Sequence, residues 1–184
     1  MSKRLVDPRR LDVEAFADAA AEVVGEWPLA KLTRLAEMAS RDAAVEPLEP
    51  IRWAARGERR KAKPGQPQIW LHLSASAVLP LICQRCLQSS TTPVAVQRSF
   101  LFVAGEEAAA ALDEESEDDV LALTRVVDLR ALVEDELLLA LPLVPKHQRC
   151  ALPLVQAPGE ALAEAEVAHP FAALASLKGS GPTR

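Results

Sequence analysis

The sequence predicts an α+β fold, in which an antiparallel, meander-like β-sheet has helices packed on one face. Four segments alternate apolar and polar residues as half-buried strands do, and they start near Ile51, Gln68, Pro93 and Val120. Three other segments carry apolar residues at steps of three and four, the spacing of one helix face. Cys83 and Cys86 fall between the second and third strand segments, which places a Cys-x-x-Cys knuckle at the tip of a hairpin.

The clearest strand pattern covers residues 68–80. Five apolar side chains fall on one face of this segment, while Trp70 and His72 fall on the polar side. We therefore expect His72 at the surface rather than as a metal ligand. Residues 93–103 form the partner strand of the hairpin, and residues 120–127 form a short strand that leads into the main helix.

The main helix is predicted over residues 129–141. Asp128 is a good N-cap, because its side-chain oxygen can accept a hydrogen bond from an amide of the first turn. Pro142 ends the helix, since its ring restricts the preceding residue. Glu134, Asp135 and Glu136 interrupt the apolar stripe, and we expect Glu134 and Asp135 to lie near water.

Two shorter helices are expected nearer the N-terminus. One covers residues 13–24 after the N-cap residue Asp12, and the other covers residues 29–39. Residues 105–119 contain eight acidic residues and no basic ones, and like charges at this density repel one another. We expect a mobile surface loop there, either disordered or weakly helical.

Length and composition fit one globular domain with a tail. The chain has 184 residues, 49% of them hydrophobic, so we expect a single domain over residues 1–178 and a disordered tail over residues 179–184. A net charge of −5 excludes a basic coat for nucleic acid, and any RNA contact needs a local patch. Aromatic residues make up only 4%, which leaves few stacking platforms for single-stranded RNA. The sequence has three cysteines and no signal-like or membrane-length apolar run, which indicates a reducing cytoplasm.

The strongest basic cluster lies between residues 52 and 63, where six cations stand against one acid, Glu58. Its members are Arg52, Arg56, Arg59, Arg60, Lys61 and Lys63. They fit either a solvated hairpin loop or a phosphate-binding loop. The second interpretation predicts an RNA affinity that falls steeply with salt.

The Cys-x-x-Cys knuckle is a candidate structural zinc site. A turn can point the sulfurs of Cys83 and Cys86 inward onto one ion, and a structural zinc takes four ligands. His147 and Cys150 supply two more if the exit of the main helix lies beside the hairpin tip. Three alternatives stay open: unpaired buried thiols, a chance placement of His147, or a site that no longer binds metal. A redox dithiol fits less well, because such a pair normally opens a helix after a strand.

Residues 169–178 could form a short amphipathic turn with Phe171, Leu174 and Leu177 on one side. This turn either folds back onto the core or docks on a partner. Elsewhere the chain has no GxSxG sequence, no P-loop and no dinucleotide fingerprint. We therefore expect a protein that is not an enzyme and has no small-molecule substrate.

Four segments together resemble the YceD family, the large ribosomal RNA subunit accumulation proteins. They are Asp7-Pro8-Arg9, the CQRC sequence at residues 83–86, VEDELLLALP at residues 133–142 followed by Pro145 and His147, and PFAALASLK at residues 170–178. The resemblance implies a bacterial cytoplasmic protein that helps large-subunit ribosomal RNA to be made, processed or kept stable. It implies that this RNA, its precursor or ribosomal proteins are the partners, rather than DNA or a membrane. No catalytic residues carry over, and the cysteine pair carries over as a motif position alone.

Overall fold

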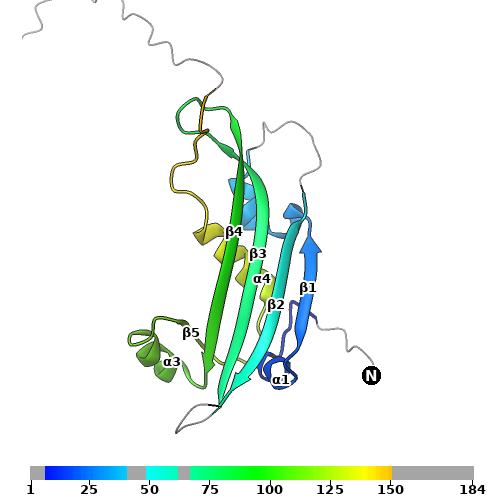
Figure 1. The fold of residues 1–184 in the computed structure, drawn as a ribbon, viewed down its shortest axis with the longest axis vertical. Helices are drawn as coiled ribbons and strands as arrows, with labels where there is room; N and C mark the ends of the chain where they lie inside the picture. The colour runs from blue at the N-terminus through cyan, green and yellow to red at the C-terminus, as the bar shows by residue number, and fades with distance from the viewer. Residues whose placement is uncertain (1–6, 41–48, 62–66, 151–184) are drawn as a thin grey trace, which may run out of the picture. The chain divides into compact units, whose positions relative to one another are not determined.

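The computed structural model describes residues 7–40, 49–61 and 67–150 of the chain. The described residues form one mixed five-stranded sheet and four α-helices, which confirms the α+β class (Figure 1). The sheet has the order β1-β2-β3-β4-β5. Its strands are β1 (Glu22–Trp27), β2 (Ile51–Arg60), β3 (Gln68–Ile82), β4 (Ser89–Val103) and β5 (Asp119–Ala122).

The first four strands form an antiparallel meander, of which the sequence predicts β2, β3 and β4 but not β1. The long β3–β4 hairpin is paired from Ile69 and Phe102 at its base to Ile82 and Ser89 at its tip. The fifth strand differs from the prediction, because β5 runs parallel to β4. The reason is the connection between the two strands, which contains α3 (Glu106–Asp113). The chain leaves β4 at Val103 and returns beside Phe100, so β5 runs in the same direction as β4.

One face of the sheet packs against α4 (Leu129–Leu139), α1 (Val13–Asp18) and the short α2 (Thr33–Met38). Figure 1 shows α4 lying across the sheet behind β3 and β4. Apolar side chains of every second residue of β3 face these helices, and Leu71 and Leu137 are fully buried there. Asp128 caps α4 as predicted, since its side chain accepts hydrogen bonds from the amides of Arg130 and Ala131.

The helix predicted over residues 13–24 is shorter than expected. Asp12 caps α1, but the helix ends at Asp18 and the chain turns at Ala20, which has a φ of +44°. The following residues form β1 instead. The helix predicted over residues 29–39 is present as a 3-10 turn followed by α2.

Residues 22–27 form the strand β1 because Gly25 and Trp27 pack against Trp53 of β2. Trp27 stacks on Trp53 with ring centroids 4.4 Å apart. A Cβ on Gly25 would lie 2.6 Å from the Trp53 ring, so only glycine lets the two strands pair beside that side chain. Helical periodicity in the sequence was therefore overridden by packing across strands.

The acidic segment at residues 105–119 is more regular than the predicted loop. Part of it forms α3, and Ala109 of this helix packs against Trp70, Leu101 and Val120. These side chains lie on the sheet face opposite to α4, so α3, which the sequence does not predict as a packed helix, lies on the other face from the three predicted helices. Trp70 is only 4% exposed, although the alternation of β3 placed it on the polar side. The mobility of this segment stays a prediction.

The acidic edge of α4 also corrects the sequence-based interpretation. Asp135 is half exposed, as expected, but Glu134 is 8% exposed and Glu136 is equally buried. Glu134 accepts a hydrogen bond from the backbone amide of Leu35 at 3.1 Å. Glu136 accepts one from Arg98 at 3.2 Å. Both carboxylates are therefore held by groups from other elements rather than by water.

Candidate metal centre

The tip of the β3–β4 hairpin is a tight turn that carries two cysteines. The amide of Cys83 donates to the carbonyl of Gln88 at 2.9 Å, and the amide of Leu87 donates back to the carbonyl of Cys83 at 2.8 Å. Leu87 adopts the left-handed conformation, with a φ of +58°, which closes the turn. The turn brings the sulfurs of Cys83 and Cys86 to one side, as a zinc knuckle requires.

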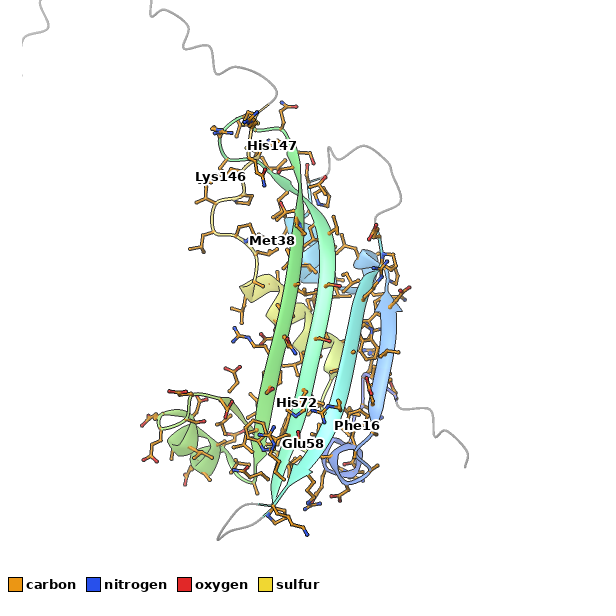
Figure 2. All side chains as sticks on the ribbon, viewed as in Figure 1. Phe16, Met38, Glu58, His72, Lys146 and His147 are labelled. Atoms are coloured by element: carbon orange, nitrogen blue, oxygen red, sulfur yellow. The ribbon has the colours of Figure 1, made fainter. Side chains whose placement is uncertain are left out.

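The segment that follows α4 returns to this hairpin tip. The amide of Gln84 donates to the carbonyl of Pro145 at 2.8 Å, which fastens the two segments together. Figure 2 shows Lys146 and His147 at the same end of the sheet as the hairpin turn. The segment after the main helix therefore lies beside the hairpin tip, as a four-ligand site requires. The donor atoms of Cys83, Cys86, His147 and Cys150 all lie within 4.8 Å of one another.

The distances between donor atoms fit a tetrahedral zinc ion. Zinc–sulfur bonds of about 2.3 Å and zinc–nitrogen bonds of about 2.1 Å give tetrahedron edges of about 3.8 Å between sulfurs and about 3.6 Å between sulfur and nitrogen. The sulfurs of Cys83 and Cys150 lie 3.9 Å apart. The sulfur of Cys86 lies 3.4 Å from Nδ1 of His147. The three thiols and the imidazole therefore need little movement to hold one ion.

The second nitrogen of His147 supports this arrangement. Its Nε2 lies 3.0 Å from the backbone carbonyl of Ser89, the first residue of β4. A carbonyl can only accept, so Nε2 carries the proton and Nδ1 faces the cysteines with a free lone pair. Metal-binding histidines are commonly oriented by such a hydrogen bond.

Arg85 balances negative charge beside the thiols. Its Nε donates to the sulfur of Cys150 at 3.0 Å, and its Nη2 donates to the carbonyl of His147 at 3.2 Å. The hydrogen bond to Cys150 raises the pKa of Arg85 above its ordinary value. A guanidinium placed on a ligand sulfur offsets the excess charge that several thiolates bring to one ion.

The pKa values of Cys83 and Cys86 shift in opposite directions, because three thiols lie close together. Burial raises the pKa of Cys83, but hydrogen bonds from the amides of His147, Arg85 and Cys86 outweigh it and lower that pKa to about 5. The amide of Gln88 lowers the pKa of Cys86, yet burial and the other two thiols raise it overall. One thiolate forms readily and suppresses the next, and a dication would remove this repulsion.

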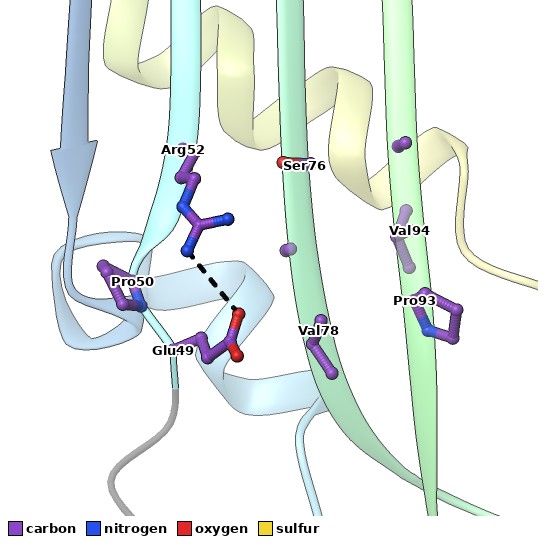
Figure 3. A pocket seen from close by; sticks show the side chains of 9 residues that line it. Glu49, Pro50, Arg52, Ser76, Val78, Pro93 and Val94 are labelled. Carbon is purple, nitrogen blue, oxygen red and sulfur yellow. Dashed lines mark ion pairs between the residues drawn. The ribbon is translucent and has the colours of Figure 1, made fainter.

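The basic cluster predicted for RNA binding lies mostly on β2, and most of its described cations face carboxylates. Arg52 pairs with Glu26 at 3.5 Å and reaches Glu49 across a shallow groove of the sheet (Figure 3). The other four pairs are those of Arg56 and Arg60 with Glu58, and those of Arg59 with Asp18 and Glu14. Lys61 is exposed, and Lys63 lies outside the described residues. RNA binding by this cluster stays a prediction.

One polar constellation was not predicted from the sequence. His72 is partly buried, with its side chain 20% exposed, rather than a surface residue as expected. Its Nε2 lies 2.7 Å from Glu58, and its Nδ1 lies 2.8 Å from the hydroxyl of Ser99. The three residues form a row across β2, β3 and β4, in which Ser99 is directly opposite His72 and Glu58 is diagonal to His72. We interpret it as a polar link across three strands.

The predicted partner-binding residues Phe171, Leu174 and Leu177 lie outside the described residues. Where the structure describes the chain, no helix is long and apolar enough to cross a lipid bilayer.

The chain is an α+β protein with a candidate structural metal centre. Three cysteines and one histidine make up this centre, and they join the tip of the β3–β4 hairpin to the segment that follows α4. A family model described as large ribosomal RNA subunit accumulation protein YceD matches residues 71–178, and the chain belongs to this YceD family. The match spans most of β3, all of β4 and α4, and all four candidate ligands. No solved structure matches the chain.

Proposed function

We propose that this protein is a non-enzymatic accessory factor for the synthesis, processing or stability of large-subunit ribosomal RNA. The observation that carries the proposal is the family match, because it covers the hairpin, the main helix and both halves of the metal centre. The cytoplasm is the compartment where such a factor would meet its RNA. Turnover of labelled precursor RNA by the purified protein would contradict the non-enzymatic part.

The proposal includes a structural zinc ion held by Cys83, Cys86, His147 and Cys150. Structural zinc sites are closed by four protein ligands, whereas catalytic sites keep one position for water or substrate. Here the protein supplies four donors from two segments that are distant in sequence. The ion would join the hairpin tip to the segment after α4 and make that end of the sheet rigid.

Elemental analysis of protein purified without chelator tests the zinc. We expect about one zinc per chain. His147→Ala removes one ligand and should lower the zinc content, while Gln148→Ala, a matched change of the exposed neighbour, should not. Less than about a tenth of an equivalent in the wild type would reject the site, since a structural ion stays bound during purification.

The cellular role is tested by deleting the gene and separating ribosomal particles on a sucrose gradient. We expect less mature large-subunit RNA and more of its precursor, and we expect the tagged protein to co-sediment with large-subunit precursors. Wild-type RNA levels in the deletion strain would contradict the accessory role. Co-sedimentation with no particle would contradict a role on the assembling subunit.

A second candidate is an adaptor that binds a ribosomal or assembly protein without touching RNA. It is favoured by exposed apolar side chains in the hairpin turn and in the segment that begins at the last residue of α4. Leu143 is 100% exposed, and Leu139 and Leu87 are largely exposed. A pull-down treated with ribonuclease separates the two candidates. Partners retained after treatment and lost with Leu143→Ser favour the adaptor, whereas partners released by ribonuclease favour RNA contact.

A further inference from the structure

The cations predicted to bind RNA are poorly placed for it. Glu26, Glu49 and Glu58 lie against Arg52, Arg56 and Arg60, and Arg59 is held by Asp18 and by Glu14. A phosphate approaching this surface meets five carboxylates beside four guanidiniums. Each pair would have to open before its cation could neutralise a phosphate and release a counterion.

The metal-centre end of the hairpin has a different charge pattern. It consists of residues 83–92 and 140–150, which the four candidate ligands bring together. This set contains Arg85, Lys146 and Arg149 and no aspartate or glutamate, within a chain of net charge −5. Lys146 and Arg149 are exposed and have no ion pair with any described residue.

The charge of a zinc-loaded centre would be balanced without Lys146 and Arg149. Three thiolates and a neutral imidazole around Zn²⁺ carry one net negative charge. Arg85 donates to the sulfur of Cys150 and to the carbonyl of His147, so it balances that charge. Lys146 and Arg149 are left as uncompensated positive charges on the surface of the centre.

The ligands also fix where these cations stand. Lys146 immediately precedes the ligand His147, and Arg149 immediately precedes the ligand Cys150. Neither residue lies in a helix or strand. Their backbone positions therefore depend on the ion together with the hydrogen bonds that join Gln84 to Pro145, Arg85 to the carbonyl of His147, and the amide of His147 to Cys83. The same set of residues contains the exposed amide side chains of Gln84, Gln88 and Gln148, which can hydrogen-bond to ribose or base edges.

We propose that Lys146 and Arg149 form a phosphate-binding site for RNA that exists only while the centre holds its metal. The site rests on the proposed function and assigns its RNA contact to the metal-centre end, away from the arginines of β2. Sequence-independent affinity comes from the two cations, and the metal keeps them at a fixed spacing. Removing the metal should therefore weaken RNA binding as much as removing the cations does.

Fluorescence anisotropy with a labelled single-stranded fragment of large-subunit ribosomal RNA tests this site. The double variant Lys146→Gln/Arg149→Gln is compared with Arg52→Gln/Arg56→Gln, which removes the same charge from β2. We expect the first to bind on the order of tenfold more weakly and its salt slope to fall by about 1.4, since each phosphate contact contributes about 0.7 on a single strand. The β2 variant should bind within about twofold of the wild type.

Metal dependence is measured with the same probe after chelation and after adding Zn²⁺ back. The metal-free wild type should match the Lys146→Gln/Arg149→Gln variant, and zinc should restore only the wild type. Zinc content and far-ultraviolet circular dichroism confirm that the variants are folded and loaded. Unchanged affinity of the Lys146→Gln/Arg149→Gln variant, or of the metal-free wild type, overturns the proposal.

The failure of this site can be told apart from failure of the proposed function. If the wild type does not bind the RNA fragment but the deletion strain still accumulates precursor, the phosphate site is wrong and the accessory role stands through a protein partner. If the deletion strain has normal ribosomal RNA, the accessory role itself is wrong, whatever the anisotropy shows.

Discussion

Leu87 is the residue at which the backbone of the knuckle is most strained. Its φ of +58° lies in the left-handed region, which costs a residue with a Cβ roughly 1–2 kcal/mol, and its side chain is largely exposed and gains little from packing. Leu87→Asn should raise the free energy of unfolding by up to about 1 kcal/mol, because asparagine tolerates this conformation. Leu87→Val should lower it, because β-branching makes the conformation worse. Urea unfolding of the zinc-loaded variants measures both, and equal midpoints would contradict the strain.

Glu58 gives a prediction about pH. Hydrogen bonds from Arg60 and then His72 lower its pKa from 4.5 to about 2. A carboxyl group with a lowered pKa in the folded state stabilises the fold above its unfolded pKa, and this contribution is lost as the pH falls through the folded pKa. The wild type should therefore lose stability relative to Glu58→Gln between pH 4.5 and about pH 2. Urea midpoints across this range measure the difference.

The matched control for Glu58 is Glu37→Gln, an exposed carboxylate of α2 with no ion pair among the described residues. Because Glu37 has no ion pair to lose among the described residues, the stability of Glu37→Gln should follow that of the wild type more closely than the stability of Glu58→Gln does. If Glu58→Gln behaves as Glu37→Gln does, the polar link from Glu58 through His72 to Ser99 contributes nothing to stability.

Residue roles were predictable where local spacing decides them. Cys83 and Cys86 lie three residues apart, as do His147 and Cys150, and the structure brings all four donors together. The burial of Glu134 could not be predicted, because its partner is an amide 99 residues earlier in the chain. Sequence periodicity places a carboxylate on a helix face, but the donor that satisfies it is known only from the fold.

Among the elements, α2 is the one whose start depends on another helix. Its N-cap position is Leu32, which has no side-chain oxygen, and the amide of Leu35 is satisfied by Glu134 of α4 instead. Arg34 adds a pair to Glu134 at 3.3 Å and one to Asp135 at 2.6 Å. Glu134 therefore both caps α2 and anchors it to α4.

Glu134→Ala should lower the free energy of unfolding by about 2 kcal/mol, because it removes a cap and leaves a buried amide without a partner. Asp135→Ala is the matched control, since it truncates the neighbouring carboxylate, which is half exposed, and should cost less than about 1 kcal/mol. Chemical unfolding of both variants measures the difference. Equal effects would show that α2 does not need the carboxylate.

Elements were predictable where one pattern extends over many residues. The 15-residue strands β3 and β4 and the helix α4 appear close to their predicted bounds. The errors concern short elements whose partners come from elsewhere. β1 depends on contact with Trp53, and α3 depends on the apolar surface made by Trp70 and Leu101. A segment of six to eight residues carries too little periodicity to show such contacts.

In the whole described chain, the hydrophobic core and the metal centre stabilise different parts of the fold. Leucine side chains from β3, α2 and α4 fill the core between sheet and helices, and only Cys83 of the four candidate ligands is fully buried. The metal centre instead closes the far end of the β3–β4 hairpin. Small zinc domains unfold without their ion because they lack such a core, but this chain has one.

Metal removal should therefore loosen one end of the molecule and leave the sheet folded. Trp53 pairs with Ala75, eight residues before Cys83, which is about 26 Å along a strand, so chelation should leave its fluorescence unchanged. Amide hydrogen exchange should become faster in residues 83–92 and 140–150, and protection at Leu71 and Leu73 should persist, because local opening there does not expose the core. His147→Ala should reproduce this pattern without chelator. Loss of protection along all of β3 after chelation would show instead that the ion holds the sheet itself together, and the metal centre would then be part of the folding core rather than a clamp at its end.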